Sequence, residues 1–311
     1  MLFRSRLRAA LVLVLVALLS LGATANAANS RLVAERANAM KTAVPQKSAS
    51  PSMAQASTVA TADQQSLDRL AQRQANRGCG ISLTPAQPKR KVGTCTVLLI
   101  GDSMGNNLGA GLSYQLERTR GVDLIRRSKG STGLSNSWFY DWPVELKPML
   151  SRYKPNLVIM MLGANDRQNM KVPGDTLSFG TTKWKAAYRA NIDKVTTMVT
   201  AAGSYLLWVG LPVMEPHSYG AGMALLNQIY ADQTPRTAGV SFLNVWDYLA
   251  DGSGNYRGQV RISQGVITIR SGDGIHFSTS GTRVLASYVI MNIRDIYSVN
   301  VRPRTEMPII G

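Results

Sequence analysis

The sequence predicts an α/β protein of three layers, in which helices cover both faces of a parallel five-stranded sheet. Two observations favour this class. Apolar, β-prone runs alternate with helix-compatible stretches from residue 96 onward. The run at residues 157–162 is almost continuously apolar, which is typical of a strand buried on both faces. Strands that alternate with helices in this way lie parallel in one sheet.

The elements follow in chain order. The first strand, at residues 96–100, runs into a Gly-Asp-Ser turn, and a glycine-containing helix is expected at 108–119. A second strand is expected at 122–126, and a helix at 143–153 in spite of Pro148. The remaining alternation gives strands at 157–162, 205–211 and 240–245, with helices at 184–201, 223–233 and 281–296.

One segment interrupts this alternation. Residues 256–270, with Gln264-Gly265 at their middle, are predicted to form a β-hairpin inserted between the last strand and the last helix.

The first 27 residues have the features of an export signal. Three arginines (Arg4, Arg6 and Arg8) precede the apolar stretch 9–21, and Ala25-Asn26-Ala27 offers a small-x-small cleavage site. The apolar stretch is shorter than the roughly 20 residues that span a bilayer. We therefore expect a cleaved signal peptide and a periplasmic or secreted protein without a membrane span, the alternative being an uncleaved anchor.

Residues 28–77 are rich in Ala, Ser, Thr, Gln, Lys and Arg and nearly lack aromatic residues. Such a segment buries little apolar surface, so it is predicted to be a flexible or partly helical spacer. Residues 78–311 are long enough for one α/β domain.

The formal net charge is +17. A charge of this size favours an anionic partner such as a cell-envelope polymer, although a basic surface that faces solvent is the simpler explanation. The basic residues are scattered and form no nucleic-acid-binding motif.

The two cysteines, Cys79 and Cys95, lie near the start of the domain. In an oxidising compartment they are expected to pair, although two free thiols are the alternative. Their spacing is not that of a metal site.

Ser103 is the candidate nucleophile. It follows the first strand and opens a helix, where free N–H groups favour a developing anion. His276 and Asp273 lie in one turn before the last helix, at a spacing that lets the carboxylate orient the imidazole. The only other histidine, His217, has no carboxylate at comparable spacing except Glu215, and is assigned a structural or substrate-facing place.

Two further segments supply candidate oxyanion donors at the same edge of the sheet. Gly163-Ala164-Asn165-Asp166 follows the third strand and offers the Asn165 side-chain amide. Ser131-Thr132-Gly133 follows the second strand and offers the Gly133 N–H, beside that of Ser103. Each residue alone has a structural explanation, such as a helix cap or a turn, but together they indicate a site.

With these residues in place, the chain resembles the SGNH (GDSL-type) hydrolase superfamily over about residues 96–299. Gly101-Asp102-Ser103, Gly163-Ala164-Asn165-Asp166 and Asp273-Gly274-Ile275-His276 are similar to its first, third and fifth blocks. Gly133 is similar to the glycine of the second block, with Gly130 as the alternative. The resemblance is to a poorly characterised periplasmic bacterial branch. It implies a flavodoxin-like fold and cofactor-free esterase chemistry.

Aromatic and basic residues near these blocks are candidates for substrate binding. Trp138, Tyr140 and Trp142 follow the second block and suit a sugar ring, or else bury the edge of the next helix. Arg270 could steer an acidic polymer, or simply face water.

The sequence thus predicts an exported serine esterase that removes acyl groups, for example O-acetyl groups, from a cell-envelope or extracellular polysaccharide, or from a small ester. An O-acyltransferase with the same triad and a non-catalytic envelope-binding protein are the alternatives. Nucleotide binding is disfavoured because the glycines after the first strand match neither phosphate-loop pattern. Two distant histidines and no His-Glu-x-x-His motif disfavour a metal site.

Overall fold

The computed structural model describes residues 64–74, 79, 93–297, 299 and 301–310. The chain divides into two units, Met1–Ser57 and Thr58–Gly311, and every described residue belongs to the second. The predicted signal peptide and residues 28–63 and 75–77 of the predicted spacer lie outside the described residues.

The predicted five-stranded parallel sheet is confirmed. Its strand order is β2-β1-β3-β6-β7, and every pairing is parallel. The strands are β1 (Cys95–Gly101), β2 (Val122–Ser128), β3 (Leu157–Met161), β6 (Tyr205–Val209) and β7 (Val240–Leu243). Because the chain moves from β1 outward to β2 and then back past β1 to β3, the carboxyl ends of β1 and β3 flank the point where ligands bind in sheets of this order.

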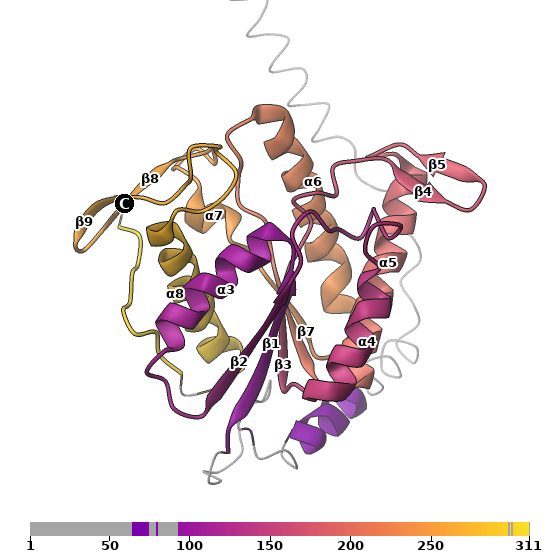
Figure 1. Cartoon of the computed structure of the whole chain (residues 1–311), viewed down its shortest axis with the longest axis horizontal. Helices are drawn as coiled ribbons and strands as arrows, with labels where there is room; N and C mark the ends of the chain where they lie inside the picture. The colour runs from indigo at the N-terminus through magenta and orange to yellow at the C-terminus, as the bar shows by residue number, and fades with distance from the viewer. Residues whose placement is uncertain (1–63, 75–78, 80–92, 298, 300, 311) are drawn as a thin grey trace, which may run out of the picture. The chain divides into compact units, whose positions relative to one another are not determined.

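Helices cover both faces of the sheet, as predicted (Figure 1). On one face α3 (Ser103–Leu116) packs along α8 (Thr279–Ile296). On the other lie α4 (Trp142–Tyr153), α5 (Thr182–Ala201) and α6 (His217–Gln233). All residues of β3 and β6 are buried, which agrees with their apolar sequences.

Two antiparallel hairpins extend beyond the sheet. The predicted one is β8 (Gln259–Ile262) and β9 (Gly265–Thr268), shorter than the range expected from sequence. The other, β4 (Met170–Val172) and β5 (Asp175–Leu177), was not predicted. A 3₁₀ turn (Thr234–Arg236) and the short α7 (Trp246–Leu249) flank β7.

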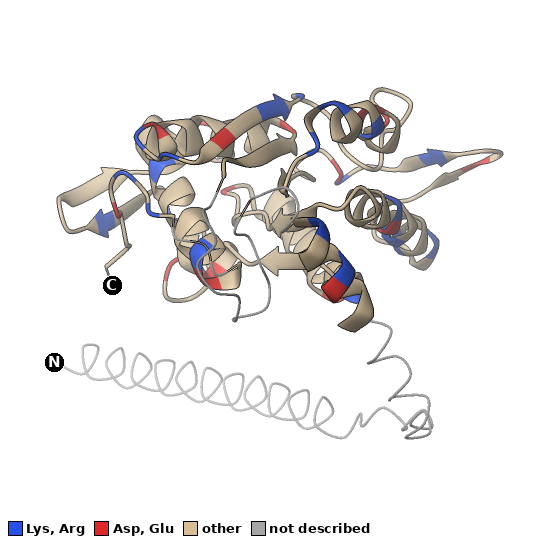
Figure 2. Cartoon of the chain, turned by 90° about the horizontal axis from the view of Figure 1, so that it is seen from below, with Lys and Arg blue, Asp and Glu red and all other residues tan. Residues whose placement is uncertain are grey.

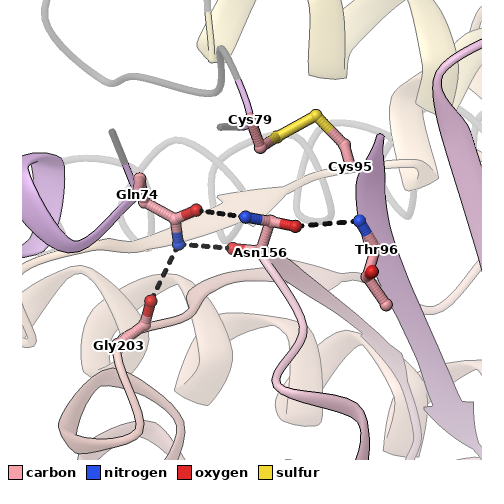
Figure 3. The surroundings of a disulfide bond; sticks show 6 residues. All are labelled: Gln74, Cys79, Cys95, Thr96, Asn156 and Gly203. Atoms are coloured by element: carbon pink, nitrogen blue, oxygen red, sulfur yellow. Dashed lines mark hydrogen bonds between the residues drawn. A yellow bond between two sulfur atoms is a disulfide. The ribbon is translucent and has the colours of Figure 1, made fainter. Parts of the chain in front are cut away.

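Residues 64–74 form a helix that packs on the domain, so this part of the predicted spacer belongs to the folded unit. Leu70 is buried, and a Cβ on Gly239 would meet its Cδ2 at 2.3 Å. The Gln74 amide donates to the backbone oxygens of Asn156 (2.9 Å) and Gly203 (2.8 Å), and accepts from the Asn156 side chain (2.8 Å) (Figure 3).

The structure joins Cys79 and Cys95 in a disulfide with a Cα–Cα distance of 5.0 Å (Figure 3). Beside it, the Thr96 N–H donates to Asn156 Oδ1 at 2.8 Å. Cys95 begins β1 and Asn156 immediately precedes β3, so these contacts lie at the amino ends of the strands. Ser103 lies beyond the opposite, carboxyl end of β1.

Lys, Arg, Asp and Glu are spread over helices, strands and loops rather than gathered on one element (Figure 2). No helix among the described residues is long and apolar enough to cross a membrane.

Candidate active site

Ser103 is the first residue of α3, directly after the turn that ends β1. Gly101 makes this turn at φ +150°, and a Cβ there would lie 1.9 Å from the Met161 carbonyl oxygen of β3. Only glycine therefore allows β1 and β3 to approach at this point. As the first helical residue, Ser103 has a backbone N–H without an intrahelical acceptor.

Asp102 caps α3 and fastens it to the loop after β3. Its Oδ1 accepts from the Met104 N–H at 2.8 Å, and its Oδ2 accepts from the N–H groups of Gly163 (3.0 Å) and Ala164 (2.9 Å). Burial raises the pKa of Asp102 to about 6, although these N–H donors act against it. The aspartate of the Gly-Asp-Ser motif thus holds two loops together and does not contact the Ser103 hydroxyl.

The structure brings Ser103, His276 and Asp273 into one hydrogen-bonded line. Ser103 Oγ lies 2.9 Å from His276 Nε2, and His276 Nδ1 lies 2.6 Å from Asp273 Oδ2. Asp273 Oδ1 also accepts from the N–H groups of Ile275 and His276, each at 2.9 Å. Partial desolvation raises the pKa of Asp273, but the hydrogen bonds from His276 and Ile275 outweigh it and lower the pKa to about 2. An ionised carboxylate therefore holds the imidazole with Nε2 toward the hydroxyl.

Arg270 shapes the turn that holds His276. Its guanidinium donates to the carbonyl oxygens of Gly274 (3.3 Å) and Ile275 (2.8 Å) and lies over the Tyr256 and Phe277 rings. The side chain is only 4% exposed, and this burial lowers its pKa to about 10. Burial and these contacts do not favour the substrate-binding role that the sequence suggests for Arg270, since the turn already uses its charge.

The candidate oxyanion donors come from three loops at the same sheet edge. The Asn165 amide donates to Thr132 O at 2.9 Å and makes a long contact of 3.5 Å with Asp102 Oδ2. The second contact is at the upper limit for a hydrogen bond, so the amide can turn toward a closer acceptor. Asn165 thereby links the Gly133 loop to the turn that bears Ser103.

Asp166 holds the Gly133 loop in place through hydrogen bonds. It accepts from the Leu134 N–H (3.0 Å), from the Ser135 N–H (2.8 Å) and hydroxyl (2.6 Å), and from the Tyr188 hydroxyl (2.7 Å). Burial raises its pKa. A Cβ on Gly133 would lie 2.0 Å from Asp166 Oδ1, so this position requires glycine.

The aromatic residues after this loop divide into two groups. Trp142 is buried, and its Nε1 donates to Thr132 Oγ1 at 3.1 Å. The structure places the Trp142 indole in the core, which favours the structural alternative for this residue over substrate binding. Tyr140 is half-buried and packs edge-on against Trp142. Trp138 and Phe139 are 68% and 47% exposed.

A depression of about 390 Å³ lies beside Asn165. Its lining residues are Ser131, Asn136, Trp138, Phe139, Asn165, Gln168 and Tyr219. Sequence reasoning missed Asn136, Gln168 and Tyr219. The only sequence signal for Tyr219 is its place after the strand β6. It lies close to His217, which is exposed at the start of α6.

Among the described residues, no cluster of three or more His, Cys, Asp or Glu side chains is arranged to hold a metal ion. The hydrogen-bonded residues Ser103, His276 and Asp273 can support acyl transfer through an activated serine.

The profile of a family described as a protein of unknown function, DUF459, matches residues 96–292. This match covers more than half of the chain and includes every residue of the site described above. The chain belongs to the DUF459 family. No protein of curated function matches the sequence.

Several solved structures are similar to this DUF459 protein at low identity. An acetylxylan esterase from Geobacillus stearothermophilus is 14% identical, with a TM-score of 0.46 over 66% of this chain and 96% of that chain. A GDSL-like lipase from Bacteroides thetaiotaomicron is 14% identical, with a TM-score of 0.45 over 74% and 97%. The esterase EstA from Pseudoalteromonas is 16% identical, with a TM-score of 0.43 over 64% and 97%.

Proposed function

We propose that this DUF459 protein is an exported serine esterase of the SGNH type that removes acyl groups, for example O-acetyl groups, from a cell-envelope or extracellular polysaccharide. The observation that supports it most is the hydrogen-bonded line from Asp273 through His276 to Ser103, with distances of 2.6 and 2.9 Å. A nucleophile, a base and a group that orients the base are what nucleophilic catalysis by serine requires.

In the first half of the reaction, Ser103 Oγ attacks the ester carbonyl carbon while His276 Nε2 takes the hydroxyl proton. Asp273 stabilises the imidazolium that results. When the tetrahedral intermediate collapses, His276 gives this proton to the oxygen of the leaving alcohol, and the acyl group stays on Ser103.

In the second half, water attacks the acyl-enzyme and gives its proton to His276. Collapse of this second intermediate releases the carboxylic acid and returns the proton to Ser103 Oγ. In both intermediates the negative oxygen would accept hydrogen bonds from the Ser103 and Gly133 N–H groups and the Asn165 amide. The cycle consumes only ester and water and uses no cofactor.

Export and substrate class are supported by sequence features. The arginines and apolar stretch before residue 27 favour secretion, and a disulfide between Cys79 and Cys95 suits an oxidising compartment. The net charge of +17 favours approach to anionic envelope polymers.

Hydrolysis of 4-nitrophenyl acetate by the purified protein tests the esterase proposal. We expect Ser103→Ala to lower kcat/KM by roughly 10³-fold or more, because no other group forms the acyl-enzyme. Ser113→Ala is the matched control, since Ser113 is exposed on the same helix. Full activity of a folded Ser103→Ala variant would overturn the proposal. An ester product that forms only when a glycan alcohol is added would identify acyl transfer instead of hydrolysis.

A further inference from the structure

We propose that the depression beside Asn165 is a subsite for one sugar ring of the acylated glycan, and that the indole of Trp138 is the surface on which this ring stacks. The inference rests on the proposed esterase function and specifies which part of the substrate is bound where.

The chemistry of the lining favours a sugar over an acyl chain. Three of the seven lining residues are aromatic (Trp138, Phe139 and Tyr219), and four bear hydroxyl or amide groups (Ser131, Asn136, Asn165 and Gln168). None is aliphatic. Amide and hydroxyl side chains supply both donors and acceptors for sugar hydroxyls, and flat aromatic faces suit the apolar C–H face of the ring. The lining offers no aliphatic side chain to a long acyl chain.

Trp138 is exposed but held in position. The ring contacts Phe139 edge-on at a centroid distance of 6.1 Å, and Lys171 Nζ of β4 lies 5.6 Å from its centroid. One contact comes from the next residue of the same loop and the other from β4, and together they restrict the orientations of the exposed ring. Neighbouring apolar side chains that both stay exposed, as Trp138 and Phe139 do, are typical of binding sites. Preorganisation of this kind reduces the entropy lost on binding.

Asn136 adds an unsatisfied acceptor to the same depression. Its Nδ2 donates to Ser131 O at 3.1 Å, and the residue is only 5% exposed. Its Oδ1 has no hydrogen-bond donor within the part of the chain that the structure describes. Ser131 has a left-handed backbone (φ 62°), which is rare for serine and is typical of functional sites. A buried oxygen without a donor is costly, and a rotation of the Asn136 side chain toward the depression would let a sugar hydroxyl donate to it.

The depression also joins the candidate catalytic groups. Asn165 is both a lining residue and a candidate oxyanion donor, so an ester substituent on a ring bound here lies next to the groups that would stabilise its carbonyl oxygen. Tyr219, on the α6 side, donates to the backbone oxygen of Ala164 and so connects the lining to the residue before Asn165.

The test compares the effect of Trp138→Ala on two substrates. We expect kcat/KM for partially O-acetylated xylo-oligosaccharides, or the best glycan acetate from a small panel, to fall about tenfold, because one stacking surface is lost. We expect hydrolysis of 4-nitrophenyl acetate to change by less than about twofold, since this ester needs only the catalytic groups. Trp138→Phe should restore part of the glycan activity. Val144→Ala, at another exposed apolar side chain (63%), is the matched control.

An equal effect of Trp138→Ala on both substrates, or no effect on the glycan, would overturn the subsite. So would a wild-type preference for 4-nitrophenyl octanoate over every acetate, because the depression would then take an acyl chain. Calorimetric titration of the deacetylated oligosaccharides into Ser103→Ala and Ser103→Ala/Trp138→Ala tests the subsite without catalysis. Binding that depends on Trp138 would support it even if the esterase proposal fails, whereas absence of binding to both would contradict it.

Discussion

Two aspartates next to the candidate catalytic residues in sequence have structural roles. Asp102 precedes Ser103 and accepts backbone N–H groups from the loop after β3. Asp166 follows Asn165 and accepts from the Gly133 loop and from Tyr188. Burial raises the pKa of both carboxyls. Residues that a motif places side by side can thus have different roles, one in chemistry and one in holding the loops.

The raised pKa of Asp102 predicts a pH-dependent contribution to stability. The pKa of Asp102 is about 6 in the folded protein, against 3.8 for an unperturbed aspartate. Protonation of Asp102 therefore stabilises the folded state fully below about pH 3.8. This stabilisation is lost as the pH rises through about 6. The free energy of unfolding of the wild type should therefore fall relative to that of Asp102→Asn between about pH 4 and pH 7, by up to about 3 kcal/mol. Urea unfolding at each pH measures this difference. The prediction would be contradicted if the difference in unfolding free energy between the two proteins stayed constant with pH, or if it shifted in favour of the wild type as the pH rose.

At the scale of the elements, the site is assembled by loops that leave neighbouring strands at one edge. Ser103 follows β1, Gly133 follows β2 and Asn165 follows β3. The turn with His276 is tied to α3 through the Phe277 N–H, which donates to Asn107 Oδ1 at 3.0 Å. Close approach of these loops depends on glycine at positions 101 and 133, where a Cβ would lie 1.9 and 2.0 Å from a neighbouring oxygen.

Gly133→Ala should damage the site far more than Gly130→Ala. A Cβ on Gly133 meets Asp166 Oδ1 at 2.0 Å, whereas one on Gly130 meets nothing within 4 Å. We expect Gly133→Ala to lower the free energy of unfolding by about 1–3 kcal/mol, because the loop must shift to relieve the overlap. We also expect kcat for 4-nitrophenyl acetate to fall at least about tenfold, since one oxyanion donor is displaced. Similar unfolding curves and kcat values for the two variants would show that Gly133 is not the glycine of the second block.

The sequence predicts the sheet, the hairpin β8–β9 and the candidate catalytic residues Ser103, His276 and Asp273 because each has a local signal. The buried strands are continuous apolar runs, and Asp273 and His276 share one turn. The sequence places Ser103 at the start of a helix but gives a helical pattern only from residue 108, because glycine and asparagine dominate the first turns of α3. The hairpin β4–β5 was missed because its strands have only three residues each. The roles of Arg270 and Trp142 depend on burial, which spacing alone does not show.

At the scale of the whole folded unit, the segment before β1 is fastened to the sheet end opposite the site. The disulfide, the Gln74–Asn156 hydrogen bonds and the packing of Leu70 on Gly239 all lie there. Composition predicts a spacer at residues 64–74, because Leu67 and Leu70 are the only large apolar residues in this polar stretch. Contacts between residues far apart in the chain decide its place.

Removal of the disulfide should lower stability and leave the chemistry intact. A separation of 16 residues between Cys79 and Cys95 corresponds to about 3 kcal/mol in the chain-entropy account. The Cys79→Ser/Cys95→Ser variant should therefore unfold at lower urea concentration, with kcat for 4-nitrophenyl acetate unchanged at temperatures where it is folded. An unfolding midpoint that neither this variant nor a thiol reductant shifts would show that the disulfide does not form in solution.

The most direct test of the central claim, that Ser103 is an activated nucleophile, is covalent labelling by a fluorophosphonate probe. The wild type and Ser113→Ala should be labelled, whereas Ser103→Ala and His276→Ala should not, because the first lacks the attacking oxygen and the second lacks the base that takes its proton. Circular dichroism of each variant establishes that it is folded. A folded wild type that takes no label, or a Ser103→Ala variant that is still labelled, would contradict the assignment of Ser103.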